Sequence, residues 1–308
     1  MMPISRPMWQ DARMNATPHR AGIGFGLLAY GIWGFFPLFF RQLAHISAMD
    51  VLSSRAVWAC VFVGLLLTLR GGWNKVAAVF RRPRQLAMLA LAALLVGSNW
   101  LMFLWAVANQ QVVASSLGYF LTPLVSVLLA LVVLKERLNP LEWISVGLAV
   151  AAIANEVITL GSLPWVSLYL AATFGTYGLV RKQVPVDALS GLWLETLAML
   201  PVCGIYASWQ AHSGHNVFGG HDLSTAALLV GAGIITALPL MAFAAATQRL
   251  DLATVGMLMY INPTLQFVTA VWIFGEPMQT SRLVSFALIW TGLFVFSWSA
   301  WRKYRHPV

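Results

Sequence analysis

Ten runs of predominantly apolar residues, each about 20 residues long, occupy most of this chain. An α-helix of that length crosses about 30 Å of hydrocarbon and satisfies its own backbone hydrogen bonds there. The chain is therefore predicted to be an all-α polytopic membrane protein with ten transmembrane helices. The predicted spans are 21–40, 51–69, 87–107, 114–134, 141–160, 163–180, 190–208, 226–247, 253–274 and 283–301.

The composition agrees with a membrane protein. Of the 308 residues, 59% are hydrophobic and 9% are charged, whereas a soluble domain carries about 25% charged residues. The net charge of +9 includes the run RRPR at 81–84, in a short loop between two spans. Attraction to membrane lipids with anionic headgroups explains this run better than nucleic-acid binding. Cys60 and Cys203 lie inside apolar spans, so no disulfide framework is predicted.

The basic residues predict the orientation, because Lys and Arg accumulate in cytoplasmic loops. With the N-terminus inside, 16 of the 19 Lys and Arg fall on the cytoplasmic side, Arg41 and Arg282 fall outside, and Arg55 lies within a span. Removing one span would scramble this asymmetry, so it also supports the count of ten. The cytoplasmic residues are Arg6, Arg13, Arg20, Arg70, Lys75, Arg81, Arg82, Arg84, Lys135, Arg137, Arg181, Lys182, Arg249, Arg302, Lys303 and Arg305.

Both ends of the chain are predicted to be short cytoplasmic tails, residues 1–20 and 302–308. Residues 1–20 contain no apolar core, and the first apolar run has no A-x-A site. That run is therefore predicted to be a span and not a cleaved signal. The longest stretch between spans, 209–225, is too short for a soluble domain.

The second half of the chain repeats the first. YFLTPLVSVLLALVVLKE places Pro123 thirteen residues before Glu136, and MYINPTLQFVTAVWIFGE places Pro263 thirteen residues before Glu276. WGFFPLFFRQ (33–42) resembles FGTYGLVRKQ (174–183), and MDVLSS (49–54) resembles VDALSG (186–191). All three matches share an offset of 137–141 residues. Two repeats, 21–160 and 163–301, are therefore predicted, with five spans each.

Five spans is an odd number, so the second repeat must enter the membrane from the opposite side. Inverted repeats of this kind are a transporter architecture, and paired helix interruptions mark the binding site. Pro123 and Pro263 interrupt corresponding spans, and Thr122 and Asn262 precede them. The alternatives are a gene duplication without moving parts and two ordinary packing kinks.

Five motifs occur in order along the chain: SRAVW (54–58), GSNWLMFLWAVANQ (97–110), SLGYFLTPL (116–124), YGLVRK (177–182) and LET (194–196). Together they resemble the RarD family, in the EamA-type branch of the drug/metabolite transporter superfamily. The resemblance covers about residues 21 to 300. It implies a permease of the bacterial inner membrane with two inverted five-helix repeats. The family is named through chloramphenicol sensitivity, and relatives in the superfamily export amino acids and other metabolites.

Three charged residues lie within predicted spans: Arg55, Glu156 and Glu195. An arginine at the bilayer centre costs roughly 2.5–3.5 kcal/mol on insertion scales, and intramembrane charges usually face a bundle interior or a wet cavity. Arg55 and Glu156 each lie about 6 Å below the outer end of their spans, so depth allows them to meet. The alternative is that Arg55 extends its charge to the outer headgroups.

Glu195 lies about 7.5 Å from the inner end of its span, and roughly 15 Å from Arg55 along the membrane normal. This separation argues against a direct ion pair between the two. A carboxylate at that depth suits proton coupling or binding of a cationic group on a solute. The alternative is a protonated acid that is hydrogen-bonded within the bundle.

Amide and aromatic side chains on several spans are candidates for lining a solute cavity. Stacking and hydrogen bonding by such groups suit a small amphipathic solute. Taken singly, most of them are packing residues or interface anchors. The candidates are Trp33, Asn99, Trp100, Tyr119, Tyr177 and Tyr260.

The predicted function is secondary transport of a small-molecule solute, amino-acid-like or chloramphenicol-like. No lysine follows a glycine, so no G-x-x-x-x-G-K-[ST] loop for ATP exists. His212, His215, His221 and Asp222 match no zinc pattern, and neither His nor Asp lies deep in a span. No metal site, cofactor or enzymatic activity is therefore predicted. The alternative function is a non-transporting channel or sensor.

Overall fold

The computed structural model describes residues 8–133, 139–219, 222–247, 249–250 and 258–305. This part of the chain folds into helices. They are α1 (Met8–Gly34), α2 (Phe36–Arg41), α3 (Ala48–Leu69), α4 (Trp73–Phe80), α5 (Pro83–Ala108), α6 (Val112–Val133), α7 (Pro140–Leu160), α8 (Trp165–Lys182), α9 (Ala188–His212), α10 (Leu223–Thr247), α12 (Ile261–Val268), a π-helical turn η1 (Thr269–Ile273) and α13 (Thr280–Arg305).

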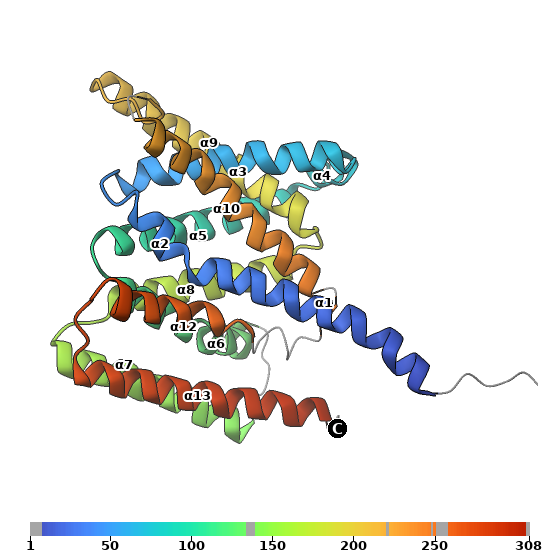
Figure 1. The fold of residues 1–308 in the computed structure, drawn as a ribbon, viewed down its shortest axis with the longest axis vertical. Coiled ribbons are helices and arrows are strands. Elements are labelled where there is room, and N and C mark those ends of the chain that lie inside the picture. The colour runs from blue at the N-terminus through green and yellow to red at the C-terminus, as the bar shows by residue number, and fades with distance from the viewer. Residues whose placement is uncertain (1–7, 134–138, 220–221, 248, 251–257, 306–308) are drawn as a thin grey trace, which may run out of the picture.

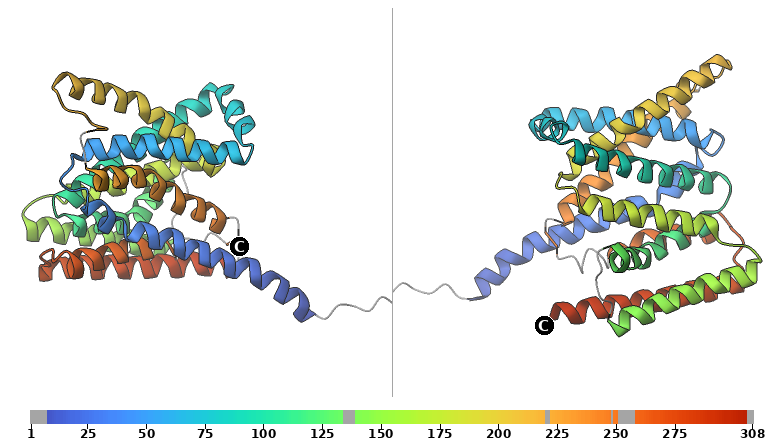
Figure 2. Two further views of the ribbon diagram at one scale, coloured as in Figure 1. Left: turned by 45° about the horizontal axis from the view of Figure 1, so that its top comes forward. Right: turned by 180° about the vertical axis from the view of Figure 1, so that it is seen from behind.

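The long helices lie side by side in one stack, with α9, α3 and α4 at one end and α7 with α13 at the other (Figure 1). The pairs of helices that pack against each other in this stack include α7 with α13, α3 with α9, α6 with α12, α6 with α8, α1 with α12, α3 with α10, α5 with α9, α1 with α10, α5 with α8, α3 with α5, and α9 with α10. The start of α1 projects from the stack (Figure 2). It lies on the same side of the stack as the end of α13 (Figure 1).

Seven of the predicted spans coincide with helices that are long and apolar enough to cross a membrane, within the described residues. They are Arg20–Arg41, α3, α5, Pro140–Thr159, α9, Leu223–Phe243 and Arg282–Ser299. The predictions at 114–134, 163–180 and 253–274 fall on α6, α8 and α12 with η1. Only the apolar stretch Val112–Ser126 of α6 qualifies as a shorter apolar helix, and residues 253–257 lie outside the described part.

Two local features differ from the expectation. Helix α1 begins at Met8, so the stretch predicted as a tail, 1–20, is helical over much of its length. The first span also breaks at Phe35, where α1 gives way to α2, with Pro37 in the first turn of α2. A proline is well tolerated at such a helix start, because the amide it lacks has no intrahelical partner there.

Side-chain caps fix several helix starts. Ser47 caps α3, and Asp187 caps α9 by accepting a hydrogen bond from the Ser190 amide. Asn139 and Glu142 form a reciprocal capping box at the start of α7. Such caps satisfy backbone amides that would otherwise lack partners. They define where α3 and α9, the two helices that carry Arg55 and Glu195, begin.

Helix α6 takes its cap from the far end of the chain. The two carboxylate oxygens of Glu276 accept hydrogen bonds from the amides of Val112 and Val113, each at 2.8 Å. Glu276 is buried and follows η1 in the ninth predicted span. Its counterpart in the first repeat, Glu136, lies outside the described residues.

Buried apolar side chains from both halves form one main cluster, which runs from Phe36 in α2 to Leu293 in α13. On the outside, large apolar side chains are exposed, for example Leu94, Ile205 and Trp272. An apolar exterior around a packed core is what a surrounding lipid phase stabilises, since exposed apolar surface there costs nothing.

Candidate functional site

Arg55 is the most deeply buried cation in the described part of the chain, with 2% of its surface exposed. Its Nε donates a hydrogen bond of 2.6 Å to Thr236 Oγ1 of α10. Its Cζ lies 4.0 Å from the centroid of the Trp100 ring and 5.2 and 5.5 Å from those of Phe40 and Phe36. The guanidinium therefore sits in an aromatic box, where ring quadrupoles stabilise its charge.

This box leaves the guanidinium incompletely satisfied. Nη1 of Arg55 is buried and has no hydrogen-bond partner. Among the described residues, no carboxylate lies within 4 Å of it. A buried charge without a counter-charge is costly, so the site is electrostatically poised for an anionic group.

Two alternatives for Arg55 are wrong. It does not extend to the outer headgroups, because its side chain is enclosed by the bundle. It does not pair with Glu156 either, since the ion partner of Glu156 is Arg282, with 3.6 Å between Nε and Oε2. Equal depth did not bring the two residues together because α3 and α7 lie at different ends of the stack (Figure 1).

Asn99 and Tyr119 form a polar junction beside this box. Nδ2 of Asn99 donates to the Leu170 carbonyl at 3.0 Å and to Thr173 Oγ1 at 2.9 Å. The Tyr119 hydroxyl donates to Asn99 Oδ1 at 3.1 Å. Three helices, α5, α6 and α8, thus meet at one fully buried amide, directly next to Trp100 in the sequence.

A row of aromatic rings leads from Arg55 to Glu195. Successive ring centroids lie 6.1, 6.2, 5.8 and 5.8 Å apart. These spacings lie within the range of favourable aromatic pairs. The rings are those of Phe40, Phe103, Tyr119, Phe174 and Tyr177.

Glu195 is held by two residues of α8. Arg181 Nε lies 3.2 Å from its Oε1, and the Tyr177 hydroxyl donates to its Oε2 at 3.2 Å. Glu195 is 2% exposed. The backbone of Gly191, one turn earlier in α9, makes room for the guanidinium: a Cβ there would lie 2.5 Å from Arg181 Nη2. Glu195 therefore has a counter-ion, Arg181, which comes from α8 and not from its own helix, α9.

The paired prolines lie in a third group, where α6 meets α12. Ser116 Oγ donates to the Pro263 carbonyl at 2.8 Å. Gln266 Nε2 donates to Asn262 Oδ1 at 2.8 Å. Thr122 Oγ1 bonds within α6, to the Gly118 carbonyl, just before Pro123.

The remaining candidates lie apart from Arg55. Trp33 packs against Tyr30 and Phe243, with ring centroids 5.5 and 5.9 Å apart. Tyr260 lies at the start of α12. Glu156 lies near the end of α7 with Arg282. The structure thus brings Arg55 together with Trp100, beside Asn99 and Tyr119, and separates the other candidates into distinct groups.

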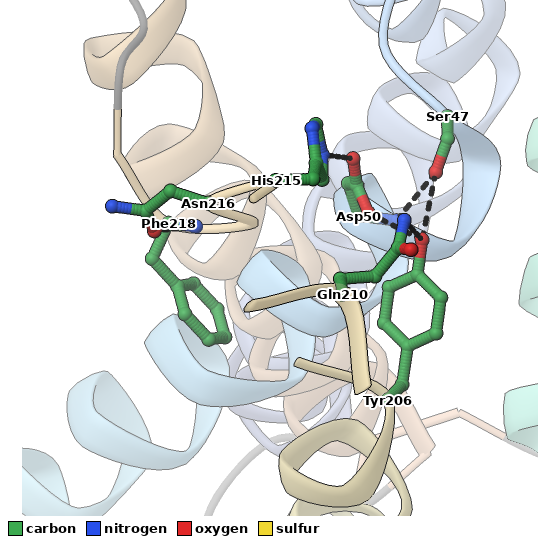
Figure 3. A network of polar contacts seen from close by, with 7 residues as sticks. All are labelled: Ser47, Asp50, Tyr206, Gln210, His215, Asn216 and Phe218. Atoms are coloured by element: carbon green, nitrogen blue, oxygen red, sulfur yellow. Dashed lines mark hydrogen bonds and ion pairs between the residues drawn. The ribbon is translucent and has the colours of Figure 1, made fainter. Parts of the chain in front are cut away.

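A polar network joins the start of α3 to the end of α9 and the loop after it (Figure 3). The Tyr206 hydroxyl donates to Asp50 Oδ1 at 2.7 Å, and His215 Nε2 lies 2.9 Å from Asp50 Oδ2. Gln210 Nε2 donates to the Tyr206 hydroxyl at 3.1 Å, and Ser47 Oγ lies 3.4 Å from it. Asp50 is buried five residues before Arg55.

Several of these residues were missed by sequence reasoning. The i, i+4 spacing of Tyr177 and Arg181 places both on one face of α8, and this spacing could have indicated a partner for Glu195. The distribution of basic residues instead places Arg181 on the cytoplasmic side of the membrane. No sequence signal indicates the others. The missed residues are Phe36, Phe40, Asp50, Thr173, Arg181, Tyr206, Thr236 and Gln266.

Comparison with known proteins defines the class. A model described as the EamA-like transporter family matches residues 20–155. One solved crystal structure is 19% identical and superposes with a TM-score of 0.58 over 90% of this chain and 96% of that one. This likeness concerns the fold alone. The helical membrane fold and the family model together define a membrane transporter.

Three relatives give the family within this class. An uncharacterised transporter of Pseudomonas aeruginosa is 43% identical and covers 93% of this chain and 96% of its own length. Protein RarD of Escherichia coli is 40% identical, with coverage of 92% and 96%. Protein RarD of Streptomyces exfoliatus is 40% identical, with coverage of 93% and 91%. The chain belongs to the RarD family of EamA-like transporters, and it is not an enzyme.

Proposed function

We propose that this protein is a secondary transporter that moves a small amphipathic solute by alternating access between two inverted five-helix repeats, 21–160 and 163–301. It does so in the bacterial inner membrane, with ten spans and both termini in the cytoplasm. The observation that carries the proposal is Arg55, a buried guanidinium in an aromatic box. Among the residues that the structure describes, its Nη1 has no hydrogen-bond partner and no carboxylate lies within 4 Å of it. The solute supplies the missing anionic group and an apolar body.

The helix neighbours support the inverted repeat. Each helix of the first repeat corresponds to one of the second: α1 to α8, α3 to α9, α5 to α10, α6 to α12 and α7 to α13. Exchanging corresponding helices converts one pair of neighbours into another. Contact of α6 with α8 becomes contact of α12 with α1, and contact of α3 with α10 becomes contact of α9 with α5. The pairs α3–α9, α6–α12 and α7–α13 map onto themselves. Such self-related pairs lie on a two-fold axis.

Two close approaches support the same symmetry at the residue level. Gly34 of α1 faces Leu265 of α12, where a Cβ would lie 2.6 Å from the leucine Cβ. Gly175 of α8 faces Val125 of α6, where a Cβ would lie 3.0 Å from the valine Cγ1. The two glycines are 141 residues apart and their partners 140, in line with the repeat offset.

The aromatic box and the Asn99–Tyr119 junction suit the two ends of an amphipathic solute. The carboxylate of an amino-acid-like solute fits a bidentate guanidinium. The nitro oxygens of a chloramphenicol-like solute carry partial negative charge and fit it less strongly. A relative from Pseudomonas aeruginosa, 32% identical, is named chloramphenicol-sensitive protein RarD. We take that name as support for the chloramphenicol-like solute.

Alternating access requires that Arg55 be reached from each side in turn, and it is enclosed in this conformation. The self-related pair α3–α9 is joined at one end by the Asp50–Tyr206 contact. Beyond the other end of α3, the ring of Trp73, the first residue of α4, meets that of Trp193 in α9 with centroids 4.9 Å apart. We assign these two contacts to the outer and inner closures. The Glu195–Arg181 pair on α9 and α8 is the candidate coupling element.

Thermal stability of the purified protein, measured with matched carboxylates and their neutral amides, tests the anionic preference. Acids that raise the Tm more than their amides then serve as labelled solutes for counterflow in proteoliposomes. We expect Arg55→Gln to lose at least tenfold in flux and Arg55→Lys, which keeps the charge but not the planar fork, to retain part of it.

Arg70→Gln is the matched control, because Arg70 is an exposed arginine at the end of the same helix. Wild-type flux in Arg55→Gln, at equal protein level, would contradict the proposed site. A channel would show solute leak without trans-stimulation, which separates it from the proposed transporter.

A further inference from the structure

A polar cavity lies between α6, α7, α8 and α13, beside the link from α7 to α8. That link is at the lower left of Figure 1. Its volume is about 400 Å³. None of the residues around Arg55 lines it. Its polar lining consists of Gln110, Gln111, Glu156, Ser162, Ser167 and Arg282.

Glu156 is the anionic group of this cavity. Its side chain is 2% exposed, and its Oε2 lies 3.6 Å from Arg282 Nε, beyond hydrogen-bond distance. Its Oε1 is buried and has no hydrogen-bond partner. A buried carboxylate oxygen without a donor is destabilising. An ammonium group entering the cavity would supply both charge and N–H donors.

Arg282 is the cationic group on the same cavity. Its side chain is 25% exposed and lines the cavity. It lies in the first turn of α13, where the helix dipole adds positive potential. A guanidinium in that position suits a phosphate. A ligand that satisfies both residues carries an ammonium and a phosphate a short distance apart.

The apolar residues of the cavity favour a lipid as the source of this ligand. Leu163, in the link from α7 to α8, and Trp165, the first residue of α8, line the cavity and are 57% and 49% exposed. Exposed Trp beside apolar residues at a span end is typical of the headgroup level of a bilayer. An acyl chain can therefore extend from the cavity into the surrounding lipid.

We propose that this cavity binds the phosphoethanolamine headgroup of a phospholipid, with the ammonium on Glu156 and the phosphate on Arg282. The site is separate from the proposed solute site, so its test does not depend on the transport proposal. The ammonium must donate hydrogen bonds to Oε1, and each N-methyl group removes one donor. Lipid binding should therefore weaken along the series from phosphatidylethanolamine through its mono- and dimethyl derivatives to phosphatidylcholine.

Native mass spectrometry of the full-length protein in detergent, with each lipid at equal concentration, measures this series. We expect phosphatidylethanolamine to bind at least tenfold more tightly than phosphatidylcholine. Glu156→Gln, which preserves the side-chain shape, should abolish the difference. Arg282→Lys should weaken all four lipids while keeping their order. Asp222→Asn is the matched control, because it removes an exposed carboxylate of the outer loop that does not line the cavity.

Binding of the four lipids to the wild-type protein tests the proposal even where a variant fails to fold. Equal binding of phosphatidylethanolamine and phosphatidylcholine would overturn the proposal. So would an undiminished preference in well-folded Glu156→Gln. Soluble phosphoethanolamine is added as a competitor. Displacement of the lipid at comparable concentration would overturn the assignment to a lipid, whereas displacement only at a large excess supports it.

Discussion

Arg55 and Glu195 occupy the same position in their helices: each lies eight residues after the N-cap residue, Ser47 in α3 and Asp187 in α9. The two side chains carry opposite charges and are both 2% exposed. Under the proposed inversion, α3 and α9 run from opposite membrane surfaces. The two charges then mark equivalent depths from opposite sides, and the row of aromatic rings connects them.

The Glu195–Arg181 pair depends on the absence of a side chain at residue 191. We expect Gly191→Ala to displace the Arg181 guanidinium, because the new Cβ would lie 2.5 Å from Nη2. The Tm should fall by several degrees, equivalent to about 1–3 kcal/mol of overpacking. Gly204→Ala on the same helix meets nothing within 4 Å and should leave the Tm unchanged or higher. Equal Tm values for the two variants would contradict the contact.

The proposed equivalence of the two repeats predicts paired effects of glycine substitution. Gly34→Ala and Gly175→Ala should both lower the Tm and the flux, the first more strongly because its overlap is closer. Gly31→Ala and Gly178→Ala lie on the same two helices and meet nothing within 4 Å. They should behave like wild type. A loss confined to one repeat would argue against symmetric α1–α12 and α8–α6 contacts.

The Asp50 network predicts that the proposed outer closure depends on the two carboxylate oxygens of Asp50. Oδ1 accepts a hydrogen bond from Tyr206 at 2.7 Å, and Oδ2 lies 2.9 Å from His215 Nε2. We expect an impermeant maleimide to label Ser54→Cys faster when Tyr206→Phe or His215→Ala removes one of these contacts.

His212→Ala is the matched control, because the His212 ring lies against the Ser208 carbonyl of its own helix, at 2.7 Å. We expect Ser54→Cys to label in this background as fast as in the parent protein. Unchanged labelling in both Tyr206→Phe and His215→Ala would contradict the assignment of this network to the outer closure.

The proposed orientation predicts which loops face the periplasm. Ser213 and Lys75 are both exposed: Ser213 directly follows the end of α9, and Lys75 lies in the short helix α4, after the end of α3. In a background lacking Cys60 and Cys203, Ser213→Cys should react with an impermeant maleimide in intact cells. Lys75→Cys should react only after permeabilisation. Reaction of both in intact cells would contradict ten spans with an internal N-terminus.

Much of the fold follows from hydropathy. The spans predicted at 51–69, 87–107 and 141–160 match α3, α5 and α7 within a few residues. Hydropathy does not distinguish types of helix, so it missed the π-helical turn η1 and the break at Phe35. The short helix α4 lies between the second and third predicted spans, where the basic residues predict a cytoplasmic loop and do not indicate a helix.

Less of the site could be predicted. Depth along a span is readable from sequence, and it separated Arg55 from Glu195. The direction in which a side chain points depends on the rotation of each helix against its neighbours. This rotation cannot be read from a single sequence. The spacing of residues along the sequence therefore signals neither the contacts of Arg55 with Trp100 and Thr236 nor the contact of Glu156 with Arg282.

The cap that Glu276 gives to α6 bears on how the chain is made. Synthesis completes the first repeat more than a hundred residues before Glu276 emerges, since N-terminal segments fold first. Until then the amides of Val112 and Val113 lack the carboxylate that binds them at 2.8 Å. The first half is thus made with an open helix end, which closes only after Glu276, just beyond η1, has been synthesised. Separately expressed halves should accordingly be unstable alone and rescue each other when produced together.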